Sequence, residues 1–120
     1  MTTLVYVAGP YRATTPWLVE QNVRRAEQMG YELTCAGLYP VIPHTNTRGY
    51  FASGQQDDAF WLAGTLELLK RCDAVALVPG WESSSGARAE AKAARDLGLP
   101  MLMPGQEMAA FVALLGGAFT

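Results

Sequence analysis

The chain has 120 residues, of which 50% are hydrophobic and 17% charged, and its formal net charge at pH 7 is −2. This length suits one domain with a single core, and the composition argues against intrinsic disorder. Binding a nucleic-acid polymer requires a basic stripe, which a slightly acidic chain does not offer. No apolar run is long enough to cross a membrane, and the first three residues lead directly into a strand rather than a signal peptide. We therefore expect one domain over residues 1–120 of a cytoplasmic protein.

Short apolar runs alternate with amphipathic stretches along the whole chain. Strands are expected at 4–8, 39–42, 74–78 and 99–103, and helices at 16–37, 57–71, 85–97 and 107–115. The intervening segment 44–56 has no periodicity and is expected to be a loop of about a dozen residues, a length that often signals function. The alternation predicts an α/β fold, a single-domain doubly wound (Rossmann/flavodoxin-like) parallel sheet of about four to five strands with helices on both faces.

In such a sheet, ligands bind beyond the carboxyl ends of the strands, near the point where the strand order reverses. Three segments of this chain are expected there, at residues 9–12, 43–47 and 79–90. These segments also hold most of the side chains that are able to carry chemistry. The candidate site is therefore expected at this edge of the sheet.

The segment Ser83–Glu90 is the most informative stretch. On a helix that begins near Ser85, Gly86 and Glu90 lie one turn apart on a stripe of small residues, and no cation lies three or four residues from Glu90. A carboxylate pointing from that stripe into the crevice is able to attack an anomeric carbon. The alternative is that Glu90 turns outward and is solvated.

Glycosyl transfer also needs a group that assists the departing base. Asp57 and Asp58, at the start of the second long helix, are candidates for this role. The competing interpretation is that they cap the helix and interact with its dipole.

The first loop contains Gly9, Pro10, Tyr11 and Arg12. Gly9 permits close backbone approach, Tyr11 is able to stack on a base, and Arg12 is able to bind a phosphate. The chain has no GxGxxG or GKS/GKT motif, which argues against dinucleotide binding and against a P-loop NTPase.

The remaining candidates are single residues. His44, directly after the second strand, is able to bond a ligand or a neighbouring loop, and Trp81 is able to line a pocket. Trp17, Phe60 and Trp61 are expected in the core or an interface, and Cys35 and Cys72 are expected to be buried free thiols. With one histidine in the chain, no metal site is expected, and no cofactor is implied.

In combination, several short motifs resemble the nucleoside 2-deoxyribosyltransferase superfamily, and most closely its short bacterial and phage branch, related to 2′-deoxynucleoside 5′-phosphate N-hydrolases. The motifs are AGPY after the first strand, an Asn and an Ala in the first helix, PH after the second strand, CDAV, PGWE and S-x-GA-x-x-E. Here they fall at Ala8–Tyr11, Asn22 with Ala26, Pro43–His44, Cys72–Val75, Pro79–Glu82 and Ser84–Glu90. The resemblance covers about residues 4–103.

The resemblance implies that Glu90 is the nucleophile that takes up deoxyribose or ribose, with Tyr6 beside it. Ser84 and Arg12 match positions that help to hold a 5′-phosphate, and Ser85 and Gly86 lie in the same loop. One departure is Thr65, which stands near the position of an aspartate that related enzymes carry about two turns before CDAV. The resemblance also implies a homodimer or larger homo-oligomer.

The sequence thus predicts an N-glycosidase or (deoxy)ribosyltransferase for a small nucleoside or nucleotide. A second enzymatic interpretation is a phosphoribohydrolase of the PGGxGTxxE type, against which the Trp81-Glu82 insertion argues. A non-catalytic nucleotide-binding or sensing module is the alternative from another class.

Overall fold

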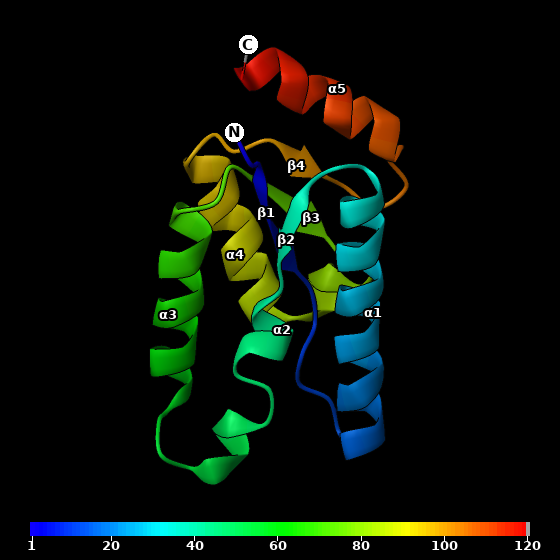
Figure 1. Ribbon diagram of the computed structural model, residues 1–120. Coiled ribbons are helices and arrows are strands. Elements are labelled where there is room, and N and C mark those ends of the chain that lie inside the picture. The colour runs from blue at the N-terminus through cyan, green and yellow to red at the C-terminus, as the bar shows by residue number, and fades with distance from the viewer. Residues whose placement is uncertain (120) are drawn as a thin grey trace.

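The computed structural model describes the backbone of residues 1–119 and the side chains of residues 1–50 and 53–116. Within that part, one parallel sheet contains β1 (Leu4–Ala8), β2 (Tyr39–Val41), β3 (Ala74–Leu77) and β4 (Met101–Leu102) in the order β2-β1-β3-β4. The chain leaves β1 towards one edge of the sheet and later returns to the other side of β1, so the order reverses between β1 and β3. The carboxyl ends of the strands point towards the lower part of the molecule in Figure 1.

Helices cover both faces of the sheet. The long helices are α1 (Pro16–Cys35), α3 (Asp58–Lys70), α4 (Ser85–Asp96) and α5 (Met108–Phe119), and the short ones are α2 (Pro43–Asn46), η1 (Tyr50–Ser53) and η2 (Trp81–Ser83). Helices α3 and α4 pack side by side on one face, and α1 covers the other (Figure 1). Helix α5 lies across the end away from the carboxyl edge (Figure 1). This architecture confirms the doubly wound α/β fold expected from the sequence.

Alternate residues of the buried strands supply the two halves of the core. In β1, Val5 and Val7 join the cluster that packs on α1 and α5, whereas Tyr6 and Ala8 join the cluster that packs on α3 and α4. A parallel strand buried on both faces reads as a continuous apolar run, which is why 4–8 shows no polar alternation. Tyr6 is the one residue of β1 with a polar tip, and it belongs to the α3–α4 face.

Local signals set the helix starts. Thr15 caps α1 by accepting from the Leu18 amide (3.1 Å), and Pro16 follows at the first helical position. Asp57 caps α3 and Ser84 caps α4 in the same way, through Phe60 and Ala87 amides at 2.9 and 3.2 Å. The buried stripe of α1 is Val23, Ala26, Gly30 and Leu33, as its spacing predicts.

Several expectations need correction. The segment 44–56 is not a uniform loop, because Pro43 begins the one-turn helix α2 and a 3-10 turn follows at Tyr50. Strand β4 is only two residues long, shorter than 99–103, since it pairs with β3 alone at the edge of the sheet. Cys35 is exposed rather than buried, because it lies in the last turn of α1 off the packed stripe; Cys72 is buried as expected.

The two aromatic side chains Trp17 and Phe60 are 70% and 50% exposed, so neither belongs to the core of the chain. Both lie in the first turns of their helices, beyond the part that packs on the sheet. In the described part of the chain, no helix combines the length and apolar character needed to cross a membrane.

Candidate active site

The candidate site lies where the strand order reverses, between the ends of β1 and β3. The backbone leaves β1 at Gly9 so close to β3 that an added Cβ would lie 2.7 Å from Val78 Cβ. The Val78 amide donates to the Ala8 carbonyl (2.9 Å), which extends the ladder by one further bond. A side chain at position 9 would push the first loop away from this edge, so glycine here is required by close approach.

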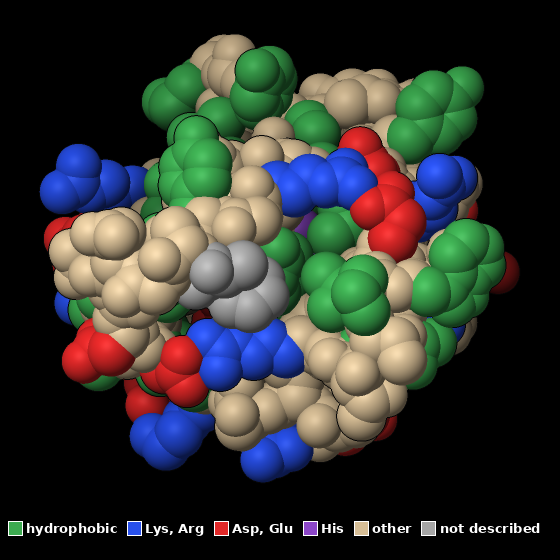
Figure 2. Space-filling view, turned by 90° about the horizontal axis from the view of Figure 1, so that it is seen from below, with side chains coloured by type: hydrophobic (Ala, Val, Ile, Leu, Met, Phe, Trp, Pro, Cys, Tyr) green, Lys and Arg blue, Asp and Glu red, His purple; other side chains and the backbone are tan. Residues whose placement is uncertain are grey.

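A cavity of about 500 Å³ opens at this edge. Figure 2 views the molecule from that side, and the purple of its one histidine is visible only in a narrow gap between other side chains. The first loop, α2, α3 and the start of α4 all contribute to the wall. The lining residues are Gly9–Arg12, Pro43, His44, Thr47, Asp58, Trp61, Leu62, Thr65 and Ser83–Ala87, with Glu90. The volume suits a ligand of nucleoside or nucleotide size.

Glu90 is the buried acid of this cavity. It is only 7% exposed, on the face of α4 that packs against the sheet. Its Oε2 accepts a hydrogen bond from the Tyr6 hydroxyl, whose ring is fully buried in β1. The structure therefore rules out an outward-turned, solvated Glu90 and brings together two residues 84 positions apart.

Burial controls the ionisation of this pair. It raises the pKa of Glu90 to about 7, and hydrogen bonds involving Tyr6 and Thr65 oppose part of that rise. Burial and the neighbouring Glu90 carboxylate likewise raise the pKa of the Tyr6 hydroxyl, so Tyr6 stays a proton donor to Glu90. A carboxyl group that titrates near neutrality in a cavity is typical of catalytic sites.

Thr65 lies near the point of α3 where the family resemblance predicts an aspartate. It lines the cavity from α3, and its hydroxyl lowers the pKa of both Glu90 and Tyr6. The same hydroxyl donates to the Leu62 carbonyl of its own helix at 3.1 Å. The helix register thus brings Thr65, and neither Asp57 nor Asp58, next to Glu90.

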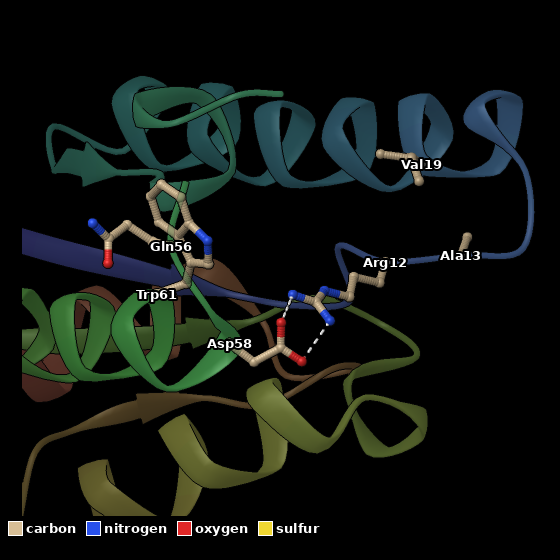
Figure 3. Close-up of a pocket in the computed structure, with 6 residues that line it drawn as sticks. All are labelled: Arg12, Ala13, Val19, Gln56, Asp58 and Trp61. Atoms are coloured by element: carbon tan, nitrogen blue, oxygen red, sulfur yellow. Dashed lines mark hydrogen bonds and ion pairs between the residues drawn. The ribbon is translucent and has the colours of Figure 1, made fainter. Parts of the chain in front are cut away.

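Asp57 and Asp58 lie further from the buried acid. Asp57 accepts from the Phe60 amide as the cap of α3, and it is not among the residues that line the cavity. Asp58 forms a two-pronged ion pair with Arg12, one arm of which, from Nη1 to Oδ2, measures 2.8 Å. Figure 3 draws a neighbouring pocket of about 250 Å³ that shares Arg12, Asp58 and Trp61 with the cavity, and it shows this pair joining the first loop to the start of α3. The Arg12 guanidinium lowers the pKa of Asp58, which is therefore ionised at neutral pH.

His44 lines the cavity from α2. It is 7% exposed, and its Nε2 lies 2.9 Å from the Pro10 carbonyl oxygen. Because that oxygen only accepts, Nε2 carries the proton and Nδ1 is an acceptor. Burial lowers the pKa of His44, so the ring is neutral. The Tyr11 ring packs edge-on against it, with centroids 5.6 Å apart.

Two buried polar atoms of the cavity residues have no hydrogen-bond partner within the described part of the chain, namely His44 Nδ1 and Trp61 Nε1. One is an acceptor and the other a donor, so each is able to bond a hydroxyl group. Buried orphan atoms of this kind are rare and often mark a ligand site.

The serine loop also reaches the cavity. Ser83, Ser84, Ser85 and Gly86 line its wall at the start of α4, and the Ser84 hydroxyl caps that helix. An added Cβ at Gly86 would meet only the Ser84 hydroxyl, at 3.9 Å, so the wall is open there.

Neither Trp81 nor Trp61 lies where the sequence predicts. Trp81 packs against the core cluster on the α3–α4 face and does not line the cavity. Trp61, expected in the core or an interface, lines the cavity from α3, one turn before Thr65. The four-residue spacing of Trp61 and Thr65 on one helix face was the available signal for this placement. The described side chains hold no cluster of three or more His, Cys, Asp or Glu residues suited to a metal ion.

Comparison with solved structures finds the same fold in a 2-deoxyribosyltransferase from the psychrotolerant bacterium Bacillus psychrosaccharolyticus, at a TM-score of 0.57 and 19% sequence identity. The match covers 88% of this chain and 77% of that one. No curated protein matches the sequence. Comparison with protein families matches residues 3–103, which include every cavity residue, to a family described as a domain of unknown function, DUF7768. The chain belongs to this DUF7768 family.

Proposed function

We propose that this protein breaks the N-glycosidic bond of a nucleoside or nucleoside 5′-monophosphate, with Glu90 as the nucleophile that takes up the sugar. The observation that carries the proposal is the buried Glu90 carboxyl group, held by the Tyr6 hydroxyl in a cavity of about 500 Å³. The fold shared with a 2-deoxyribosyltransferase supports the same class of reaction.

In this reaction a Glu90 oxygen attacks C1′ of the sugar, and the electron pair of the C1′–N bond leaves with the base. Water or a second base then displaces Glu90 from C1′, which gives hydrolysis or transfer respectively. The Tyr6 hydroxyl fixes the carboxylate orientation, and burial removes the water that would otherwise solvate it.

The other cavity residues are assigned to substrate binding. Arg12 and the amide groups of Ser85 and Gly86 at the start of α4 suit a 5′-phosphate. His44 Nδ1 and Trp61 Nε1 suit a sugar or base hydroxyl, since one accepts and the other donates.

A non-catalytic nucleotide-binding module is the second candidate. Thr65 favours it, because a threonine stands beside Glu90 where the resemblance predicts an aspartate. Assembly into a homo-oligomer and a cytoplasmic location stay predictions.

The decisive experiment is chromatographic detection of free base from a panel of nucleosides and 5′-monophosphates. Glu90→Gln is expected to reduce release by at least about 1,000-fold, because the amide cannot form the glycosyl ester. Glu27→Gln, an exposed position of α1, is the matched control and is expected to retain activity.

Binding is followed in parallel by calorimetry. Ligand binding without base release by the wild type would contradict the glycosidase and favour the binding module. Base release that survives in Glu90→Gln would contradict the role of Glu90.

A further inference from the structure

Departure of a neutral base leaves negative charge on its nitrogen, so glycosidases normally provide a general acid. Each group of the cavity that carries a dissociable proton is therefore a candidate acid. The described side chains at issue are Tyr6, Tyr11, Arg12, His44, Asp58 and Glu90.

Apart from Glu90, the nearest carboxyl groups are those of Asp57 and Asp58, and neither is suited to protonate a departing base. Asp58 is held ionised by Arg12, and the side chain is 77% exposed at the rim of the cavity. Asp57 caps α3 and lies outside the lining. Thr65, beside Glu90, has a hydroxyl too weakly acidic to protonate a base.

The other proton donors are committed elsewhere. The single proton of the neutral His44 ring is donated to the Pro10 carbonyl. The Tyr6 hydroxyl donates to Glu90, and the Tyr11 hydroxyl is held beside the Gly49 backbone, whose amide donates to it at 3.1 Å. Cys72 lies near Tyr6 but donates to the Leu68 carbonyl, and burial raises its pKa to about 11. Arg12 stays protonated at all accessible pH values.

The charges and the aromatic rings of the cavity favour a positively charged ligand. The cation that lines it, Arg12, is paired with Asp58, and no described ion pair reaches Glu90. A positively charged ligand would supply the counter-charge that the buried carboxylate lacks. Tyr11 and Trp61 contribute aromatic rings to the wall, which attract a cationic ring through their π faces.

We propose that the site acts on nucleosides or nucleotides whose base already carries a positive charge, such as an N-ribosylpyridinium or an N7-alkylated purine. This inference rests on the proposed function and names its substrate class. A cationic base needs no proton from the enzyme, because the electron pair of the breaking bond neutralises it.

The reaction balances without a further reactant except water. A Glu90 oxygen forms a bond to C1′ while the C1′–N⁺ bond breaks, and the base leaves as a neutral molecule. Water then attacks C1′, the C1′–O bond to Glu90 breaks, its electron pair restores the carboxylate, and the proton of water passes to solvent.

The test compares charged and neutral bases of equal size. Nicotinamide riboside, its 5′-monophosphate and 7-methylguanosine are the cationic substrates, and dihydronicotinamide riboside and guanosine are their neutral counterparts. Each kcat/KM is divided by the spontaneous hydrolysis rate of the same compound. We expect a normalised preference of about 100-fold or more for the cationic member of each pair, the lower end of a general acid's contribution.

The pH profile provides a second readout. For a cationic substrate, kcat/KM is expected to rise as Glu90 ionises, with a midpoint near its pKa of about 7, and then to stay level. The profile is taken with nicotinamide riboside, whose charge does not titrate, because 7-methylguanosine loses its N1 proton near neutral pH. A falling alkaline limb with nicotinamide riboside would reveal a required acid and overturn the inference.

Thr65→Asp adds a carboxyl group beside Glu90, and like charge there keeps one of the two protonated. We expect Thr65→Asp to raise cleavage of guanosine by about 10-fold or more and to reduce the preference for cationic bases. Thr65→Asn is expected to do neither. The substrate panel and the pH profile use the wild type, so they test the cationic preference even where Thr65→Asp fails to fold.

The outcomes separate the two proposals. Neutral and cationic bases released at normalised rates within about threefold would overturn the cationic preference and leave the glycosidase intact. No release from any substrate would overturn the proposed function itself. Preference for only the pyridinium pair or only the purine pair supports the inference and identifies the source of the charge.

Discussion

The buried Glu90 carboxyl group lowers the stability of the folded chain when it is charged. A carboxyl group that is 7% exposed and has the Tyr6 hydroxyl as its bonded partner loses most of the hydration that favours its charged form. Its pKa therefore lies at about 7 in the folded chain, against an ordinary value of 4.5. Active-site residues often lower stability in this way, because the charge they need is unfavourable in the site that activates it.

The Glu90 pKa gives a stability prediction with a definite sign. The folded state binds the extra proton, so stability from this group is fully present below pH about 4.5 and is lost as pH rises through about 7. Glu90→Gln, which is never charged, is expected to resemble the wild type near pH 4.5 and to exceed it above pH 7, by on the order of 3 kcal/mol. Urea unfolding across this pH range measures the difference. A deficit of Glu90→Gln at alkaline pH, with Glu27→Gln unchanged, would contradict the prediction.

At the scale of elements, the site depends on how closely the first loop approaches β3. Gly9 follows the last residue of β1, and the Val78 amide bonds the Ala8 carbonyl at the same place. The loop then continues through Pro10 to Arg12, which ties it to Asp58 of α3. An exposed pair of this kind contributes little free energy, so the loop position is set mainly by backbone packing at Gly9.

Two glycine substitutions test this view. In Gly9→Ala the new methyl group would lie 2.7 Å from Val78 Cβ, which cannot move without the strand, and we expect a loss of about 1–3 kcal/mol. Gly64→Ala, inside α3 with no atom within 4 Å of the added methyl, is the control and is expected to gain about 0.5–1 kcal/mol. Denaturant unfolding measures both. A neutral Gly9→Ala would show that the loop has room at this position.

At the scale of the whole molecule, helix α5 lies outside the segment that the family match covers. The match ends at residue 103, yet Phe111 is fully buried and joins the core cluster of β1, β3 and α1. Helix α5 thereby packs on the same sheet face as α1 and contacts the edge strand β4. We infer that α5 stabilises the fold without forming the cavity, whose lining residues all lie before it.

Two alanine variants test whether α5 packs as part of the core. Phe111→Ala is expected to lower the free energy of unfolding by about 3–5 kcal/mol, because it leaves a void in the core. Leu114→Ala, at a side chain that is 52% exposed, is expected to stay within about 0.5 kcal/mol of the wild type. Calorimetric unfolding compares the two. Equal effects would mean that α5 does not pack as a defined part of the core.

The sequence by itself determined the alternation of strands and helices and the edge of the sheet where the candidate residues gather. These features follow from periods and propensities within a few residues, so one chain is enough to read them. The Tyr6–Glu90 contact, the Arg12–Asp58 pair and the entry of Trp61 into the cavity were decided only by the tertiary structure. Each joins residues or elements far apart in the chain, and such contacts depend on strand order, register and helix rotation, which local patterns do not specify.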